Sequence, residues 1–242
     1  MRLEKASHKA VKYACLHFHY AKSIPVNVFG YNVFNDAKEW CGVILYGTGA
    51  NNNIAKAYNL KQGEVIELVR MALNGKQEST SKALSISLKL IKKDVPLCKM
   101  IVSYADKDQN HTGIIYQATN WIFTGVSMEN KPDASFVIDG KRIHGKTISD
   151  KCKNFGLVKN IENIKRVYKS NNVEAYITKG KIKYLYPLCD ETKQLCKTLS
   201  KEYPKNNQCD ISLNGKTTDI QSEDGVRVDH IAQIENPTKT LS

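Results

Sequence analysis

The segment Cys98–Gly125, CKMIVSYADKDQNHTGIIYQATNWIFTG, decides the fold. An apolar, β-branched run ends abruptly at Ser103 and Asp106, and a polar loop then leads into a short helical pattern that holds Tyr116. An open α/β sheet places its ligands where buried strands end in this way. We therefore expect a ligand cleft at this turn, although an ordinary solvated strand-to-helix turn has the same pattern.

Hydrophobic periodicity predicts a mixed α/β sheet along residues 1–190. The expected elements are an amphipathic helix at 7–20, a hairpin with its turn at Asn35–Asp36, a strand at 64–73, a helix that ends before Pro96, a strand at 98–104, the Tyr116 helix, a strand near 121–125 and a last strand at 181–188. In the strand at 64–73, alternation places Ile66, Leu68, Arg70 and Ala72 on one face.

A long basic insertion interrupts this order at residues 128–180. Over 131–183 there are 13 Lys and Arg against 5 Asp and Glu. The whole chain has a net charge of +12, which indicates a polyanionic partner, although a solvated basic face is the alternative. We expect one domain over 1–190 that includes the insertion, followed by a C-terminal helix and a polar tail over 191–242.

The seven cysteines include no CxxC pair, and no apolar run reaches the length of a membrane span. We therefore expect a reduced cytoplasmic protein that does not enter a membrane and has no zinc ribbon.

Five ordered pieces of the chain resemble the Mom family of phage DNA-modification proteins. The first is SYADKDQNHTGIIYQATNWIFTG, and the others are HYAKSIP at 19–25, YGTGANN at 46–52, ELVR at 67–70 and KIKYLYPL at 181–188. The resemblance implies a fold similar to GCN5-related N-acetyltransferases (GNAT), and the predicted element order agrees with it. It also implies that adenine in phage DNA becomes N6-(carbamoylmethyl)adenine, which shields the DNA from host restriction enzymes.

The resemblance suggests catalytic or base-binding roles for the residues of the expected cleft. Asp106 could orient a base or accept the proton of the adenine amine. Tyr116 could donate to a developing oxyanion or to the base, although a tyrosine on such a helix is commonly core. Arg70 is the last residue of the ELVR motif. If its side chain faces inward from this apolar strand, the buried charge needs a carboxylate or a ligand as a partner, whereas an outward-facing side chain does not. Ser103 borders the same cleft. Tyr20, within HYAKSIP, is expected to stack on or hydrogen-bond the base.

The substrate of such an enzyme is double-stranded DNA with an extruded adenine, because the amine is out of reach inside the duplex. Tyr20, Trp121 and Tyr116 are candidates to line the base pocket. The insertion is expected to hold phosphates with little sequence reading. Its candidate DNA-binding residues are Lys141, Arg142, Lys146, Lys165 and Arg166.

The donor of the two-carbon group is unknown. In acetyltransferase-like folds the loop after the fourth strand holds a pyrophosphate, and here that loop offers Ser79, Thr80, Ser81 and Lys82 at a helix N-terminus. The glycine-spaced pattern of coenzyme A users is missing, however. Acetyl transfer would also give an amide at N6 rather than a methylene, so a glycine-derived donor is considered beside acetyl-CoA.

Three other hypotheses remain open. His17, His19 and His111 are a minority candidate for a metal site, because His17 and His19 would point in different directions on one helix. An N-acyltransferase acting on protein, tRNA or a small amine is the main alternative function. A non-catalytic basic DNA-binding module is the alternative of a different class.

Overall fold

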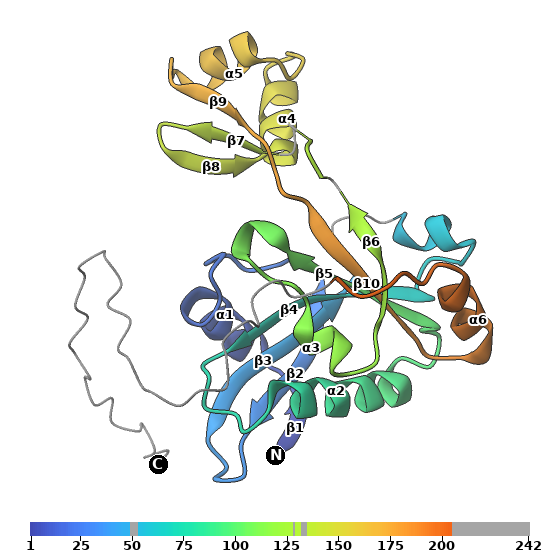
Figure 1. Ribbon diagram of the computed structural model, residues 1–242. Helices are drawn as coiled ribbons and strands as arrows, with labels where there is room; N and C mark the ends of the chain where they lie inside the picture. Colours follow the sequence, from blue (N-terminus) through green and yellow to red (C-terminus); the bar gives the residue numbers. More distant parts are fainter. Residues whose placement is uncertain (49–52, 128, 132–134, 205–242) are drawn as a thin grey trace, which may run out of the picture. The chain divides into compact units, whose positions relative to one another are not determined.

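A mixed sheet organises the fold (Figure 1). The computed structural model describes residues 1–48, 53–127, 129–131 and 135–204; the expected polar tail lies outside them from residue 205 onward. Within the described part, the sheet order is β1-β2-β3-β4-β5-β10-β6, and the only parallel pair is β4 with β5. The strands are β1 (Arg2–Lys5), β2 (Val28–Phe34), β3 (Trp40–Gly47), β4 (Val65–Leu73), β5 (Met100–Asp106), β6 (Ile122–Ser127) and β10 (Lys181–Pro187).

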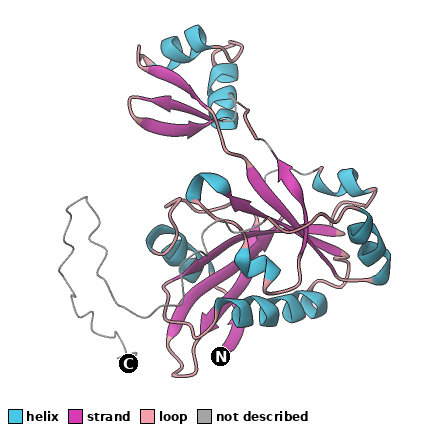
Figure 2. Cartoon of the chain, in the orientation of Figure 1, coloured by secondary structure: helices cyan, strands magenta, loops and turns pink. Residues whose placement is uncertain are grey.

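Helices cover both faces of this sheet (Figure 2). On one face, α2 (Thr80–Asp94) and the short α3 (Ile114–Gln117) cover a core that includes Leu84, Ile101 and Tyr184. On the other, α1 (His8–His17) packs against β3 and β4. The 3-10 helix η1 (Ile54–Tyr58) and α6 (Asp190–Thr198) complete that second face over β5 and β10. The predicted mixed α/β class with flanking helices is confirmed.

Short polar signals set the helix ends. Ser7 begins α1 and Ser79 begins α2, because each hydroxyl accepts a backbone N–H of the first turn, from Ala10 at 3.3 Å and from Lys82 at 3.2 Å. Pro96, two residues beyond the end of α2, cannot continue the helix. Within the described residues, no helix has the length and apolar composition needed to cross a membrane.

The basic insertion folds around a core of its own. Its antiparallel sheet has the order β8-β7-β9, from β7 (Ser135–Ile138), β8 (Lys141–His144) and β9 (Val173–Tyr176). The helices α4 (Gly145–Asn154) and α5 (Ile161–Tyr168) pack on this sheet. The shared core is Phe136, Ile138, Ile148, Cys152, Ile164 and Val173. The insertion precedes the last strand of the main sheet, as predicted.

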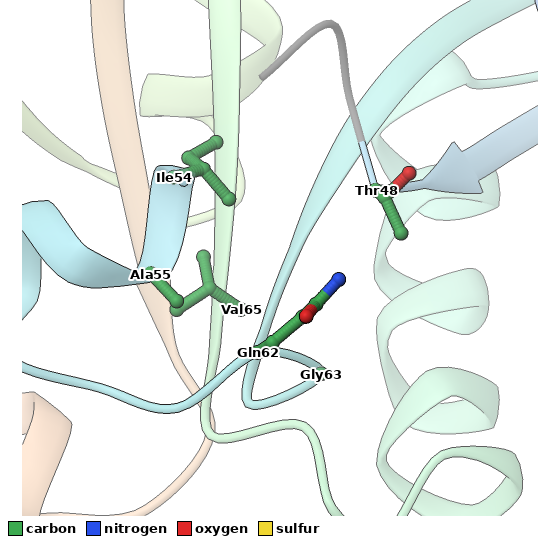
Figure 3. Close-up of a pocket in the computed structure, with 6 residues that line it drawn as sticks. All are labelled: Thr48, Ile54, Ala55, Gln62, Gly63 and Val65. Atoms are coloured by element: carbon green, nitrogen blue, oxygen red, sulfur yellow. The ribbon is translucent and has the colours of Figure 1, made fainter. Parts of the chain in front are cut away.

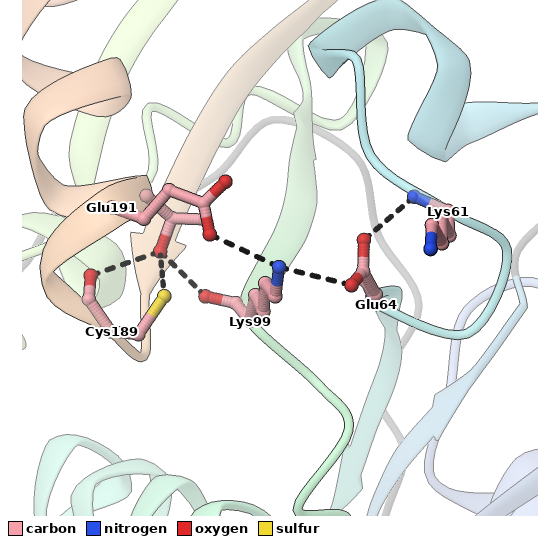
Figure 4. Close-up of polar contacts among 6 residues, drawn as sticks. Lys61, Glu64, Lys99, Cys189 and Glu191 are labelled. Atoms are coloured by element: carbon pink, nitrogen blue, oxygen red, sulfur yellow. Dashed lines mark hydrogen bonds and ion pairs between the residues drawn. The ribbon is translucent and has the colours of Figure 1, made fainter.

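The last helix is clamped to the start of β5 (Figure 4). Thr192 donates its hydroxyl to the carbonyl of Lys99 at 2.7 Å, and the Lys99 ammonium lies 3.0 Å from both Glu64 and Glu191. Cys196 of α6 is fully buried against Met100. Although a boundary near residue 190 was expected, α6 packs on the main sheet, and the compact unit extends to Lys205.

Candidate active site

The parallel pair β4–β5 separates halfway along its length. Pairing covers Val65–Glu67 with Met100–Val102 and then stops, although both strands continue. At the next position the Ser103 hydroxyl, rather than its backbone, reaches the Leu68 carbonyl at 2.9 Å. The predicted splay at the carboxyl ends of these strands is confirmed.

A bulge in β4 decides which way Arg70 faces. Leu45 pairs with Arg70 while Tyr46 pairs with Leu68, so Val69 has no partner in β3. Leu68 packs on the α2 side of the sheet, whereas Ala72 packs on the α1 side. The expectation that Ile66, Leu68, Arg70 and Ala72 share one face is therefore wrong, because the extra residue reverses the alternation after Leu68.

Arg70 consequently lies on the α1 side of the sheet. Its guanidinium donates a hydrogen bond to the carbonyl of Ser23, in the segment that follows α1. Its Nε is buried and has no hydrogen-bond partner among the described residues. An unpaired buried donor on a cation is costly, so this atom is suited to a ligand oxygen.

Aromatic and imidazole rings gather beside Arg70. The Tyr20 ring lies 4.3 Å from that of His19 and 6.0 Å from that of His111, measured between centroids. The backbone N–H of His111 donates to the Asp106 carbonyl at 3.1 Å, which brings the end of β5 to the same place. Tyr20 is 51% exposed, so about half of the residue is open to solvent and to a ligand.

Electrostatic interactions connect these groups. Burial raises the pKa of Tyr20, as does the Asp106 carboxylate, and Arg70 opposes the change. Burial, followed by the positive charge of Arg70, lowers the pKa of His19 to about 4. His19 is therefore neutral at pH 7. Because its Nδ1 accepts the N–H of Ala21 at 3.1 Å, Nε2 carries the proton and is a hydrogen-bond donor.

Asp106 lies at the end of β5 and keeps one carboxylate oxygen free of hydrogen bonds to the described residues. Its Oδ1 accepts the N–H of Asp108 at 3.0 Å and so begins the 3-10 helix η2 (Lys107–Gln109). No described residue hydrogen-bonds the second oxygen. The structure thus brings three of the expected site residues together, namely Tyr20, Arg70 and Asp106.

Ser103 and Tyr116 form a separate pair on the α2 side. Their hydroxyls are 2.8 Å apart, and the Tyr116 ring packs against Trp121 and Tyr184 with centroids 5.2 and 4.9 Å away. Burial raises the pKa of Tyr116 to about 12, so it is protonated at neutral pH. Tyr20 also contributes to this increase in pKa, so the two groups lie within electrostatic reach across the splay. Trp121 is fully buried and does not line an open pocket.

The loop proposed for a donor pyrophosphate fits that group poorly. The Ser79 hydroxyl caps α2 and lies 3.0 Å from that of Ser81, and Thr80 accepts a hydrogen bond from Gln77 at 2.9 Å. The Glu78 carboxylate is held at this loop by the N–H of Asp36, at 2.6 Å. The first-turn hydroxyls are thus occupied and a carboxylate stands beside them, which disfavours an anion. Lys82 makes no hydrogen bond or ion pair through its side chain within the described residues. No step is assigned to coenzyme A.

Asp108, which the sequence analysis did not single out, joins the insertion to this site. Its carboxylate accepts hydrogen bonds from Arg142 at 2.8 Å, Thr178 at 3.0 Å and the backbone of Lys179 at 2.9 Å. Burial acts to raise the pKa of Asp108, but these donors outweigh it and lower the pKa. Arg142, expected to bind DNA, is thus ion-paired, and it also stacks on the Tyr176 ring at 3.8 Å.

The other candidate DNA-binding residues differ from Arg142 in having no ion pair within the described part of the chain. Lys141, Lys146 and Arg166 are exposed, and Lys165 is half-buried.

Two further features of the described residues bear on the site. No group of three or more His, Cys, Asp or Glu side chains is arranged there to hold a metal ion. His17, on the last turn of α1, stacks on Tyr13 at 4.2 Å rather than joining His19.

A small hollow lies at the opposite end of β4 (Figure 3), lined by Thr48, Ile54, Ala55, Gln62, Gly63 and Val65. It begins five residues before Arg70, roughly 16 Å along the strand.

Comparison with known proteins places the chain in a family. The sequence model of the Mom protein family matches residues 1–205, which is most of the chain. The chain belongs to the Mom protein family. A curated Mom relative is the methylcarbamoylase Mom of Escherichia phage Mu, 27% identical over 135 residues. The aligned part is 54% of this chain and 54% of that relative, so the chain spans about half of its length.

Two solved structures are similar to this Mom protein. One is an acetyltransferase of Bacillus subtilis in complex with CoA, with a TM-score of 0.43 and 11% identity, covering 78% of this chain and 99% of the other. The second is the spermidine/spermine N-acetyltransferase SpeG of Vibrio cholerae, with manganese ions. Its TM-score is 0.41 and its sequence identity is 7%. The match covers 80% of this chain and 95% of the other.

Proposed function

We propose that this protein modifies adenine in double-stranded phage DNA at N6, giving N6-(carbamoylmethyl)adenine, and thereby protects the DNA from restriction. The observation that carries the proposal is the convergence of Tyr20, Arg70 and Asp106 at the splayed end of β4 and β5 in a chain of the Mom family. The phage Mu relative is named a methylcarbamoylase, which agrees with this chemistry.

Each of these three residues has a different role in the proposed reaction. The adenine amine is a weak nucleophile because its lone pair is delocalised into the ring, and the second oxygen of Asp106 is available to take its proton as the new bond forms. The exposed Tyr20 ring offers a surface on which an extruded base stacks. The unpaired Arg70 Nε offers a donor for the carbonyl oxygen of the transferred group.

Neutral His19 adds a second donor beside the base. Its Nε2–H points to a role in hydrogen bonding rather than in proton uptake, because its lowered pKa of about 4 keeps it neutral at pH 7. Tyr116, protonated and hydrogen-bonded to Ser103, is a further candidate donor on the α2 side of the sheet. A donor other than acetyl-CoA is favoured, because the α2 loop is self-capped and carries Glu78.

Restriction resistance tests this function. Plasmid recovered from bacteria that express the chain should resist endonucleases whose recognition sites contain adenine, and plasmid from cells expressing Asp106→Asn should be cut. The matched control is Asp190→Asn, which removes a carboxylate from the first turn of α6 and should leave the plasmid protected. Equal cutting of all the plasmids would contradict the proposal.

A further inference from the structure

The loop between α4 and α5 carries large apolar side chains in the open. Phe155 is 64% exposed and Val158 is 79% exposed, and Ile161, the first residue of α5, is 47% exposed. Phe155 and Val158 are only three positions apart in a segment that has a core of its own. Exposed apolar groups clustered in this way mark a contact surface more often than single scattered ones do.

Residues 155–160, which join α4 to α5 and are called the tip below, have a backbone held by hydrogen bonds. After α4, the N–H of Gly156 bonds the Lys153 carbonyl at 2.8 Å and that of Leu157 bonds the Cys152 carbonyl at 3.0 Å. With Gly156 at a φ of +70°, this is the Schellman arrangement. Leu157 packs against the core of the insertion, as the residue at this position commonly does. Phe155 and Val158, on either side of it, remain outside.

The start of α5 locks the other side of the tip. The Asn160 side chain accepts the N–H of Asn163 at 2.8 Å, and the Asn163 side chain donates to the Val158 carbonyl at 2.9 Å. A tip that is already ordered loses little conformational entropy when it binds a partner.

The two helices that meet at the tip are rich in positive charge. Residues 145–169 contain seven Lys and Arg against two Asp and Glu. Lys146, Lys153, Arg166 and Lys169 of this group are exposed. An apolar tip within a cationic surface matches a polyanion that also has an apolar interior, and stacked DNA bases between two phosphate backbones have this combination.

We propose that Phe155 and Val158 form a wedge that enters a base step of duplex DNA from the minor groove while the surrounding cations bind phosphates. The inference rests on the proposed function, because it takes DNA as the substrate. Apolar side chains inserted in this way unstack a step and kink the duplex. A locally unstacked step lowers the cost of extruding an adjacent base.

DNA bending by the full-length chain tests the wedge. A duplex of roughly 30 base pairs carries a donor and an acceptor fluorophore at its ends, and energy transfer and affinity are measured across a salt series. Wild type should raise the energy transfer. Phe155→Ser with Val158→Ser should bind roughly tenfold more weakly, with an unchanged salt slope and no rise in transfer at saturation. Unchanged thermal unfolding shows that this variant is folded.

Two other variants complete the design. Leu97→Ser changes an apolar residue that is 76% exposed, outside the insertion, and should behave as wild type. Lys153→Gln with Arg166→Gln should flatten the salt slope and still bend DNA at saturation.

The wedge is overturned if wild type binds DNA without bending it, or if the Phe155/Val158 variant bends and binds as wild type does. It is also overturned if that variant instead loses self-association in sedimentation, since the tip is then an interface between copies. Failure of the proposed function is a separate result. It would appear as an absence of modified adenine in the DNA of cells that express wild type.

Discussion

Asp106 has one carboxylate oxygen held by the N–H of Asp108, and no described residue hydrogen-bonds the other. Asp106→Asn keeps the shape but removes the charge that accepts a proton. We expect modification of adenine to fall by about 10²-fold or more, the usual size of a general-base effect. DNA affinity and thermal stability should stay near wild type, which gel-shift and unfolding measurements would check. A fully active variant would mean that this turn is structural.

Tyr116 is the harder residue to interpret, because its ring is core and only its hydroxyl faces the splay. Tyr116→Phe removes the bond to Ser103 and costs about 1 kcal/mol of unfolding free energy, and Ser103 retains Leu68 as an acceptor. If the hydroxyl acts in the reaction, modification should fall by about 10²-fold. A loss of stability with full modification would assign Tyr116 to the core alone.

His19 makes stability depend on pH. In the unfolded chain its pKa returns to 6.5, whereas in the folded protein it is about 4. Between these values the unfolded state binds the extra proton, so stability falls as pH drops from 6.5 toward 4. His19→Gln should therefore show a shallower fall of the melting temperature across this window. Equal slopes for the two proteins would contradict the neutral, half-buried imidazole.

At the scale of elements, the insertion is joined to η2 by Asp108. The Asp108 side chain is only 1% exposed and accepts three hydrogen bonds, one of them from Arg142. We expect Asp108→Asn to lower the unfolding free energy by about 2 kcal/mol, since bonds to a charged group are worth more than neutral ones. Glu174→Gln, on an exposed position of β9, is the matched control and should unfold as wild type does.

Local signals predicted most elements correctly. The Asn35–Asp36 turn and the end of α2 before Pro96 each follow from residues close together in sequence, which a single chain displays. The faces of β4 did not follow, because the bulge at Val69 arises from pairing with β3 and leaves no mark in the alternation of VIELVR. β1, α4 and β9 were also not predicted; β1 and β9 are four-residue strands with little periodicity.

At the scale of the molecule, the site joins segments far apart in sequence. The sequence predicted one cleft for Arg70, Ser103 and Asp106, but only the fold shows that Arg70 and Asp106 lie beside Tyr20 and that Ser103 pairs with Tyr116. The Asp108 cluster was missed for a related reason. Its partners Arg142 and Thr178 are 34 and 70 residues away, and nothing in the local pattern of KDQ distinguishes a buried acceptor from a solvated aspartate.

Phosphate binding by the insertion predicts a strong salt dependence for the whole protein. Lys141→Gln, Lys146→Gln and Arg166→Gln each remove an exposed cation that makes no ion pair within the described residues. Each should weaken binding to all duplex sequences and reduce the slope of log affinity against log salt by about 1. Arg142→Gln should change this slope less, because Arg142 is paired with Asp108. Unchanged slopes for the first three would place the DNA elsewhere.

Mass spectrometry of nucleosides tests the central claim most directly. DNA from bacteria that express the full chain is digested to nucleosides, beside DNA from cells that express Asp106→Asn or Asp190→Asn. We expect N6-(carbamoylmethyl)adenine as the deoxynucleoside with wild type and Asp190→Asn, and at least about 10²-fold less of it with Asp106→Asn. Unmodified adenine in all samples, or an N6-acetyl product in its place, would contradict it.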